Sequence, residues 1–91
     1  MPRDHLKIKF TKKADSSLDR LPKQIALRIL AKLEWLSEHT QVRIKQLAGL
    51  PSELSGLLKY RIGDYRVLFW ITEDSIIVYR IGHRSEIYKN I

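Results

Sequence analysis

The sequence predicts an α+β fold in which one strand and two helices precede three antiparallel strands, in the order β-α-α-β-β-β. Two patterns carry this prediction. Apolar residues recur every three or four positions between residues 11 and 36, which is the period of an amphipathic helix. From residue 57 onward, β-branched and aromatic residues alternate with charged ones, which is the period of a strand with one buried face.

The first strand is expected at residues 6–10, where apolar and basic side chains alternate. Thr11 follows as the N-cap of a first helix, whose apolar residues have helical spacing: Ala14, Leu18 and Leu21. Pro22 suits the first position of a second helix after a tight break. That helix has the strongest periodicity in the chain, with these core positions: Ile25, Ile29, Leu33 and Leu36.

The sheet is expected to follow a less regular connection at residues 37–55, with Leu47 and Leu50 at the edge of the core. Its strands are expected at residues 57–62, 65–72 and 76–81. Gly63 and Asp64 then form a two-residue hairpin loop, which makes Ile62 and Tyr65 cross-strand partners.

This register sorts the side chains of the hairpin onto two faces. One face is apolar and is expected to pack on the helices: Leu58, Tyr60, Ile62, Tyr65, Val67, Phe69 and Ile71. The other carries Lys59, Arg61, Arg66, Leu68 and Trp70. In the last strand Ile77, Tyr79 and Ile81 are expected to face the helices, because the opposite parity buries Arg80 without an evident partner. Residues 84–88 form either a short C-terminal helix or an extended tail.

Composition limits the classes of protein that fit this chain. Ninety-one residues with 44% hydrophobic content are typical of one domain, spanning residues 1–91. Seventeen Lys and Arg against ten Asp and Glu give a net charge of +7, so the expected partner is an anion, either nucleic acid or an acidic protein. The absence of cysteine excludes a disulfide scaffold and a thiol nucleophile. No apolar stretch approaches the roughly 18 residues of a membrane span, and no signal peptide is visible, so a cytoplasmic location is expected.

Three parts of the chain together resemble the RelE/ParE superfamily of type II toxin–antitoxin toxins, and within it the RelE branch. They are residues 8–14 (IKFTKKA) running into 18–22 (LDRLP), residues 58–67 (LKYRIGDYRV) and residues 81–88 (IGHRSEIY). The resemblance implies a RelE-like fold and an endoribonuclease that cuts mRNA codons in the ribosomal A site. It implies cleavage by the ribose 2′-hydroxyl without a metal or cofactor, and inhibition by an acidic antitoxin. A gyrase poison of the ParE type and a noncatalytic RNA- or protein-binding module remain alternatives.

Attack by a 2′-hydroxyl adds negative charge to the phosphate oxygens, so cations aimed at that phosphate stabilise the transition state. Arg66 stands among apolar strand residues, where its guanidinium either grips the phosphate at two oxygens or pairs with Asp64 or Glu86. The resemblance implies a lysine general base in the preceding strand. Lys59 either fills that role or, like Arg61, binds RNA only through its charge.

The remaining candidates lie near the C-terminus and in the helices. Arg84 matches an arginine to which the resemblance gives leaving-group or phosphate stabilisation. His83 either donates a proton to the leaving 5′-oxygen or is a surface residue. Tyr88 matches a tyrosine that stacks on a base, or else it packs on Trp70. Four basic residues are expected to form a solvent-exposed helix face that also contacts ribosomal RNA: Lys12, Lys13, Arg20 and Lys23.

Overall fold

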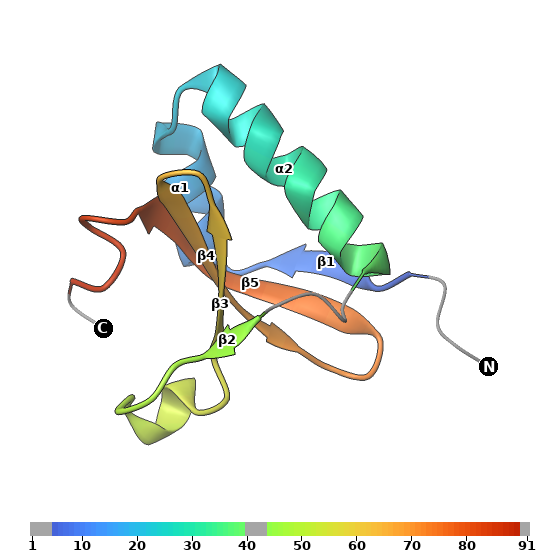
Figure 1. The fold of residues 1–91 in the computed structure, drawn as a ribbon, viewed down its shortest axis with the longest axis vertical. Coiled ribbons are helices and arrows are strands. Elements are labelled where there is room, and N and C mark those ends of the chain that lie inside the picture. Colours follow the sequence, from blue (N-terminus) through green and yellow to red (C-terminus); the bar gives the residue numbers. More distant parts are fainter. Residues whose placement is uncertain (1–4, 40–43, 90–91) are drawn as a thin grey trace.

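The computed structural model describes residues 5–39 and 44–89. In chain order its elements are β1 (Lys7–Phe10), α1 (Lys12–Arg20), α2 (Lys23–Glu38), β2 (Lys45–Gln46), a 3-10 turn (Ser52–Leu54), β3 (Leu58–Ile62), β4 (Tyr65–Ile71) and β5 (Ser75–His83). The strands form one sheet in the order β1-β5-β4-β3-β2, against which the two helices pack (Figure 1). The predicted α+β fold is therefore confirmed. Neither helix of the described residues has the length and apolar character needed to cross a bilayer.

The first helix begins after the predicted N-cap, Thr11, and the second begins one residue later than predicted, at Lys23. The Thr11 hydroxyl accepts a hydrogen bond from the Ala14 backbone N–H at 3.1 Å and donates one to the Tyr79 carbonyl at 2.8 Å. One side chain therefore caps α1 and ties its start to β5. Pro22 immediately precedes α2, and the apolar stripe of that helix is fully buried at Ile29, Leu33 and Leu36.

The β3–β4 hairpin has the predicted register, with Ile62 paired to Tyr65 across the turn. Six of the seven residues of its predicted apolar face join the core that packs on the helices, whereas Ile71 is 36% exposed and lies outside that core. The antiparallel meander of β3, β4 and β5 is also as predicted. The short β1 adds to the far side of β5 in parallel, so the complete sheet is mixed.

The predicted orientation of β5 is wrong for Ile77 and Tyr79. Ile76 and Val78 lie in the core beneath the helices, together with Ile81. Val78 pairs with Phe69 while Arg80 pairs with Leu68, so Tyr79 is the extra residue of a β-bulge. The bulge reverses the alternation, which lets Arg80 reach the opposite face without being buried among the helices.

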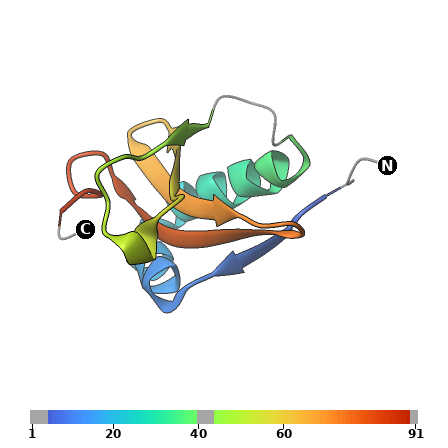
Figure 2. The ribbon, with the colours of Figure 1, turned by 90° about the horizontal axis from the view of Figure 1, so that it is seen from below.

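The face of the sheet opposite α2 carries a second, smaller apolar cluster. Its buried members are Leu57, Leu68 and Ile87, and Leu47, Leu50, Trp70 and Tyr79 pack against them. Leu47 and Leu50 thus pack on this face. Residues 84–89, the C-terminal segment, form consecutive turns rather than a regular helix or an extended tail. The segment lies beside the β3–β4 hairpin (Figure 2).

The hairpin turn requires a glycine at position 63. Gly63 has a φ of 59°, and a Cβ built there would lie 3.3 Å from Nη2 of Arg28. Gly63→Ala is expected to lower the free energy of unfolding by about 1–2 kcal/mol, because L-residues with a Cβ disfavour the left-handed region. Urea denaturation measures the loss. Gly63→Asn is the matched control and should lose less, because asparagine tolerates this conformation; an alanine variant as stable as the native protein contradicts the argument.

Candidate functional site

Three cations project from β3 and β4 on the face opposite α2: Lys59, Arg61 and Arg66, here called the sheet-face cluster. Lys59 and Arg66 are half-buried and Arg61 is exposed. Arg61 and Arg66 are direct cross-strand partners, an arrangement of like charges that destabilises a sheet. No ion pair within residues 5–39 and 44–89 involves any of the three. The cluster is therefore a concentration of positive charge suited to an anion.

The side chain of Arg66 is positioned by the backbone of the hairpin turn. Its Nη1 donates to the carbonyl oxygens of Gly63, at 3.1 Å, and of Tyr65, at 3.0 Å. The predicted alternative, an ion pair with Asp64 or Glu86, is not what the structure shows: Asp64 contacts Arg84, and Glu86 contacts Lys89. Because the two carbonyls use only Nη1, Nε and Nη2 have no hydrogen-bond partner in the described part of the chain.

The C-terminal segment brings Tyr88 to the sheet-face cluster. Nζ of Lys59 lies 5.7 Å from the centroid of the Tyr88 ring. Ile87 is buried in the small apolar cluster, and Nη1 of Arg80 donates to the Lys89 carbonyl at 2.8 Å. Trp70, the alternative neighbour predicted for Tyr88, packs edge-on against Tyr79 instead. Tyr88 is 42% exposed, so its ring remains open to a ligand beside Lys59.

Arg84 lies at the same end of the hairpin as the guanidinium of Arg66. Its backbone N–H donates to the Asp64 carbonyl at 2.8 Å, and its Nε lies 3.6 Å from Oδ1 of Asp64. Both side chains are more than half exposed, so this ion pair adds little stability and leaves the guanidinium accessible. The structure therefore brings Tyr88 to the face that carries the sheet-face cluster, and Arg84 to the hairpin turn at the end of that face.

His83 lies on the other face of the sheet. It pairs with Tyr65 across the strands, and the two rings meet edge-on with centroids 5.5 Å apart. Its Nδ1 accepts from the Ser85 N–H at 3.1 Å, and the Ser85 hydroxyl lies 2.8 Å from the same nitrogen. Gly82, not His83, is the residue of β5 that lies opposite Arg66. The candidate site therefore does not include His83.

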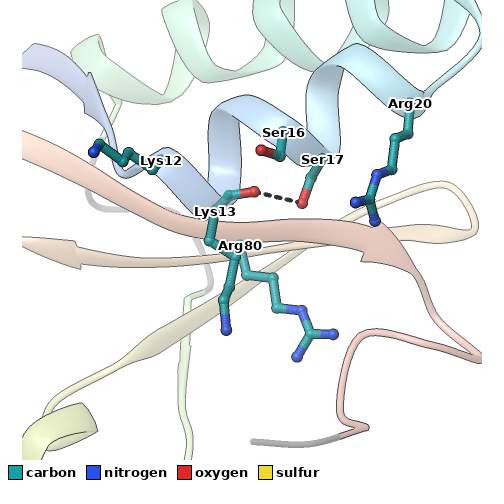
Figure 3. Close-up of a pocket in the computed structure, with 6 residues that line it drawn as sticks. All are labelled: Lys12, Lys13, Ser16, Ser17, Arg20 and Arg80. Atoms are coloured by element: carbon teal, nitrogen blue, oxygen red, sulfur yellow. Dashed lines mark hydrogen bonds between the residues drawn. The ribbon is translucent and has the colours of Figure 1, made fainter.

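The predicted basic residues of the helices separate into two places. Lys12, Lys13 and Arg20 line an open pocket beside α1, whereas Lys23 is exposed at the start of α2 and does not line it (Figure 3). Ser16, Ser17 and Arg80 complete the lining. Sequence reasoning placed Arg80 on the face away from the helices, as observed, but gave it no functional role, because nothing in the sequence shows that this side chain lies beside α1.

Comparison with known proteins agrees with the sequence resemblance. A family model described as the ParE toxin of a type II toxin–antitoxin system, parDE, matches residues 8–88. A search of curated proteins gave no match. Among solved structures, the toxin–antitoxin complex RelBE2 from Mycobacterium tuberculosis contains a chain with 26% identity and a TM-score of 0.79, covering 93% of this chain and 98% of that one.

Two further solved structures have the same fold. A chain of the RelB–RelE antitoxin–toxin complex from Methanococcus jannaschii is 25% identical with a TM-score of 0.68, covering 91% of this chain and 98% of that one. A chain of the E. coli RelBE toxin–antitoxin complex is 18% identical with a TM-score of 0.65, covering 86% of this chain and 95% of that one. In each comparison, the similarity therefore covers most of this chain and nearly all of the matched chain.

Proposed function

The chain belongs to the RelE/ParE superfamily of type II toxin–antitoxin toxins, and on that premise we propose that it is a ribosome-dependent endoribonuclease that cuts mRNA in the A site. One observation carries the proposal. Three cations that form no ion pair with the described residues lie on one sheet face, next to an accessible tyrosine ring. In the proposed reaction the ribose 2′-hydroxyl gives its proton to solvent water as its oxygen attacks the adjacent phosphorus, and the bond to the 5′-oxygen breaks as that oxygen takes up a proton from solvent. The products are a 2′,3′-cyclic phosphate and a 5′-hydroxyl.

The site residues take roles that follow from their positions. Arg66 has free N–H donors on a guanidinium held by the turn, so in the proposal it binds the nonbridging oxygens on which charge develops. Arg61, directly opposite, adds positive charge to the same place. Arg84, at the end of the hairpin, stabilises the leaving oxygen, and Tyr88 stacks on a base of the mRNA. The proposal assigns no role to His83, which pairs with Tyr65 on the face toward the helices.

We assign Lys59 an electrostatic role rather than that of general base. In the proposal its ammonium, which lies 5.7 Å from the centroid of the Tyr88 ring, contributes positive charge beside the phosphate. Lys59→Ala is expected to slow mRNA cleavage by roughly 10- to 100-fold, which is a loss of about 1.4–2.7 kcal/mol. Lys59→Arg is expected to retain most of the activity, since arginine keeps the charge but cannot act as a base.

Single-turnover cleavage of mRNA on programmed ribosomes measures both Lys59 variants. Co-sedimentation with the same ribosomes reports binding and should change little for either one. If Lys59→Arg is as slow as Lys59→Ala while binding is retained, Lys59 acts as a base. Equal loss of binding and cleavage in the alanine variant instead assigns it to docking alone.

We also propose that an acidic antitoxin binds and inhibits this toxin in the cytoplasm. A net charge of +7 supports an acidic partner, and similar chains were solved in complexes with antitoxins. The partner and the mRNA compete in this proposal for the positive surface of the toxin.

A gyrase poison is the second candidate, because the matching family model describes a ParE toxin. Primer extension on mRNA from cells expressing the chain separates the two functions. Cuts within translated codons support the endoribonuclease, whereas intact mRNA with gyrase-linked DNA breaks overturns it in favour of the poison. Intact mRNA and intact DNA point to a noncatalytic binding module. If the purified protein cuts naked RNA at the same rate as ribosome-bound mRNA, only the proposed dependence on the ribosome is rejected.

A further inference from the structure

The pocket between α1 and β5 is lined mainly by positively charged side chains. Four of its six lining residues are cations, namely Lys12, Lys13, Arg20 and Arg80, and the other two are Ser16 and Ser17 (Figure 3). Among the residues that the structure describes, no acidic and no apolar one lines it. Its volume is about 560 Å³. This lining is suited to an anion that accepts several hydrogen bonds.

The pocket results from two features of the fold. The hydroxyl of Thr11 binds the Tyr79 carbonyl, so α1 starts beside the bulge of β5. Positions 12, 13, 16, 17 and 20 then fall on one side of the helix. The bulge turns Arg80 to that same side, where Nζ of Lys13 lies 5.5 Å from the centroid of the Tyr79 ring. The hydrogen bond of Thr11 therefore positions the basic side chains of α1, and the bulge positions Arg80.

We propose that this pocket binds a backbone phosphate of single-stranded RNA, at a position along the strand different from the phosphate held by the sheet-face cluster. The inference rests on the proposed function and extends its contact with RNA. Phosphate oxygens accept hydrogen bonds from lysine, arginine and serine alike. Ser17 donates to the Lys13 carbonyl at 2.9 Å, whereas the Ser16 hydroxyl has no hydrogen-bond partner among residues 5–39 and 44–89 and is available to a ligand.

The lining favours RNA over an acidic protein. Interfaces between proteins have an apolar core in which aromatic side chains are enriched. This pocket contributes no apolar side chain, and its donors are the groups that bind phosphates along a nucleic acid strand.

The pocket and the sheet-face cluster can contact the same strand of RNA. Arg80 pairs with Leu68, and Leu68 pairs with Lys59, so the three residues form one row across β5, β4 and β3. Adjacent strands lie about 4.8 Å apart, which places the Arg80 and Lys59 backbones about 10 Å apart on the same face. Arg80 also donates to the Lys89 carbonyl, so the segment that carries Tyr88 joins the two sites.

The test measures binding without cleavage. Fluorescence anisotropy follows a labelled 2′-O-methyl RNA oligonucleotide, which lacks the nucleophilic hydroxyl, at several salt concentrations. Lys13→Gln and Arg20→Gln are each expected to weaken binding about 3- to 10-fold. Each is also expected to reduce the slope of log affinity against log salt by about 0.7, the value for one lost contact with a single strand. Lys32→Gln on α2 removes the same charge outside the pocket and should change affinity less than about twofold.

Each outcome decides the inference. Equal losses in Lys13→Gln, Arg20→Gln and Lys32→Gln overturn it, because net charge alone then explains binding. The inference is also overturned, in favour of an acidic protein, if binding of a polyglutamate peptide depends on the pocket residues and binding of RNA does not. Native affinity in the pocket variants, with loss in Arg66→Ala, overturns the inference and leaves the proposed function intact. A native protein that cuts no mRNA on ribosomes, yet binds the oligonucleotide through the pocket, rejects only the proposed function.

Discussion

Arg66→Ala is expected to slow cleavage of ribosome-bound mRNA by about 10²–10³-fold. The guanidinium is held at the turn by the carbonyls of Gly63 and Tyr65, and its free donors face the position proposed for the phosphate. Removing one fixed donor to oxygens on which charge develops has an effect of this size in other enzymes. Single-turnover cleavage on programmed ribosomes measures the loss.

Two controls separate the chemistry of Arg66 from docking and folding. Arg66→Lys keeps the charge but loses the planar fork, so its rate should lie between those of the native protein and the alanine variant. Lys32→Ala, on α2, should leave cleavage unchanged. Ribosome binding by the Arg66 variants should stay within about threefold of the native value, since one of many surface charges is lost. A parallel loss of binding and cleavage, or an unfolded alanine variant beside a fully active lysine variant, speaks against a catalytic role.

The hairpin was predictable because residues close together in the sequence determine its turn and its register. The Gly63–Asp64 loop fixes the pairing of Ile62 with Tyr65, and alternation then assigns each remaining side chain to a face. Lys59, Arg61 and Arg66 could therefore be grouped from the sequence alone. The same reasoning failed in β5, because a bulge depends on how the strand meets β4 and the helices, and no residue type at position 79 announces it.

The bulge also sets the surfaces that the residues after it reach. It carries Arg80 to the pocket beside α1, and the alternation that follows it puts Gly82 opposite Arg66 and His83 opposite Tyr65. The adjacent positions of His83 and Arg84 in the sequence do not show which surface of the protein each side chain reaches. The position of a single extra residue in the strand decides this.

Gly82 is a sequence feature that indicates the position of the C-terminal segment. A Cβ at Gly82 would lie 3.3 Å from Cδ1 of Ile87, so the glycine permits the close approach of the segment to β5. Glycine inside a strand often marks such an approach. The sequence alone allowed a helix or a tail because residues 84–89 have no periodicity. Contact with Gly82, Leu57 and Leu68 determines their path instead.

Ile87→Ala is expected to release the C-terminal segment and slow cleavage at least tenfold. Ile87 is 1% exposed and packs between Leu57 and Leu68, so truncation to alanine removes about 2–5 kcal/mol of packing. The segment is then held at its start by the contacts of Arg84 with Asp64, and near its end only by those of Lys59 with Tyr88 and of Arg80 with Lys89 among the described residues. Because the segment ends the described chain, the loss is expected as local opening, with a smaller change in the unfolding of the helices and sheet.

Hydrogen exchange of residues 84–89 measures this opening, and urea denaturation measures the stability of the rest. Ile87→Val is the matched control, with an expected loss of about 0.5–1.5 kcal/mol and nearly native cleavage. If Tyr88 acts beside Lys59, the cleavage rate should fall in proportion to the population of the docked segment, and Tyr88→Ala combined with Ile87→Ala should add little further loss. Native cleavage by a variant whose segment exchanges freely means that Tyr88 takes no part, and the site is then reduced to the cations of β3, β4 and Arg84.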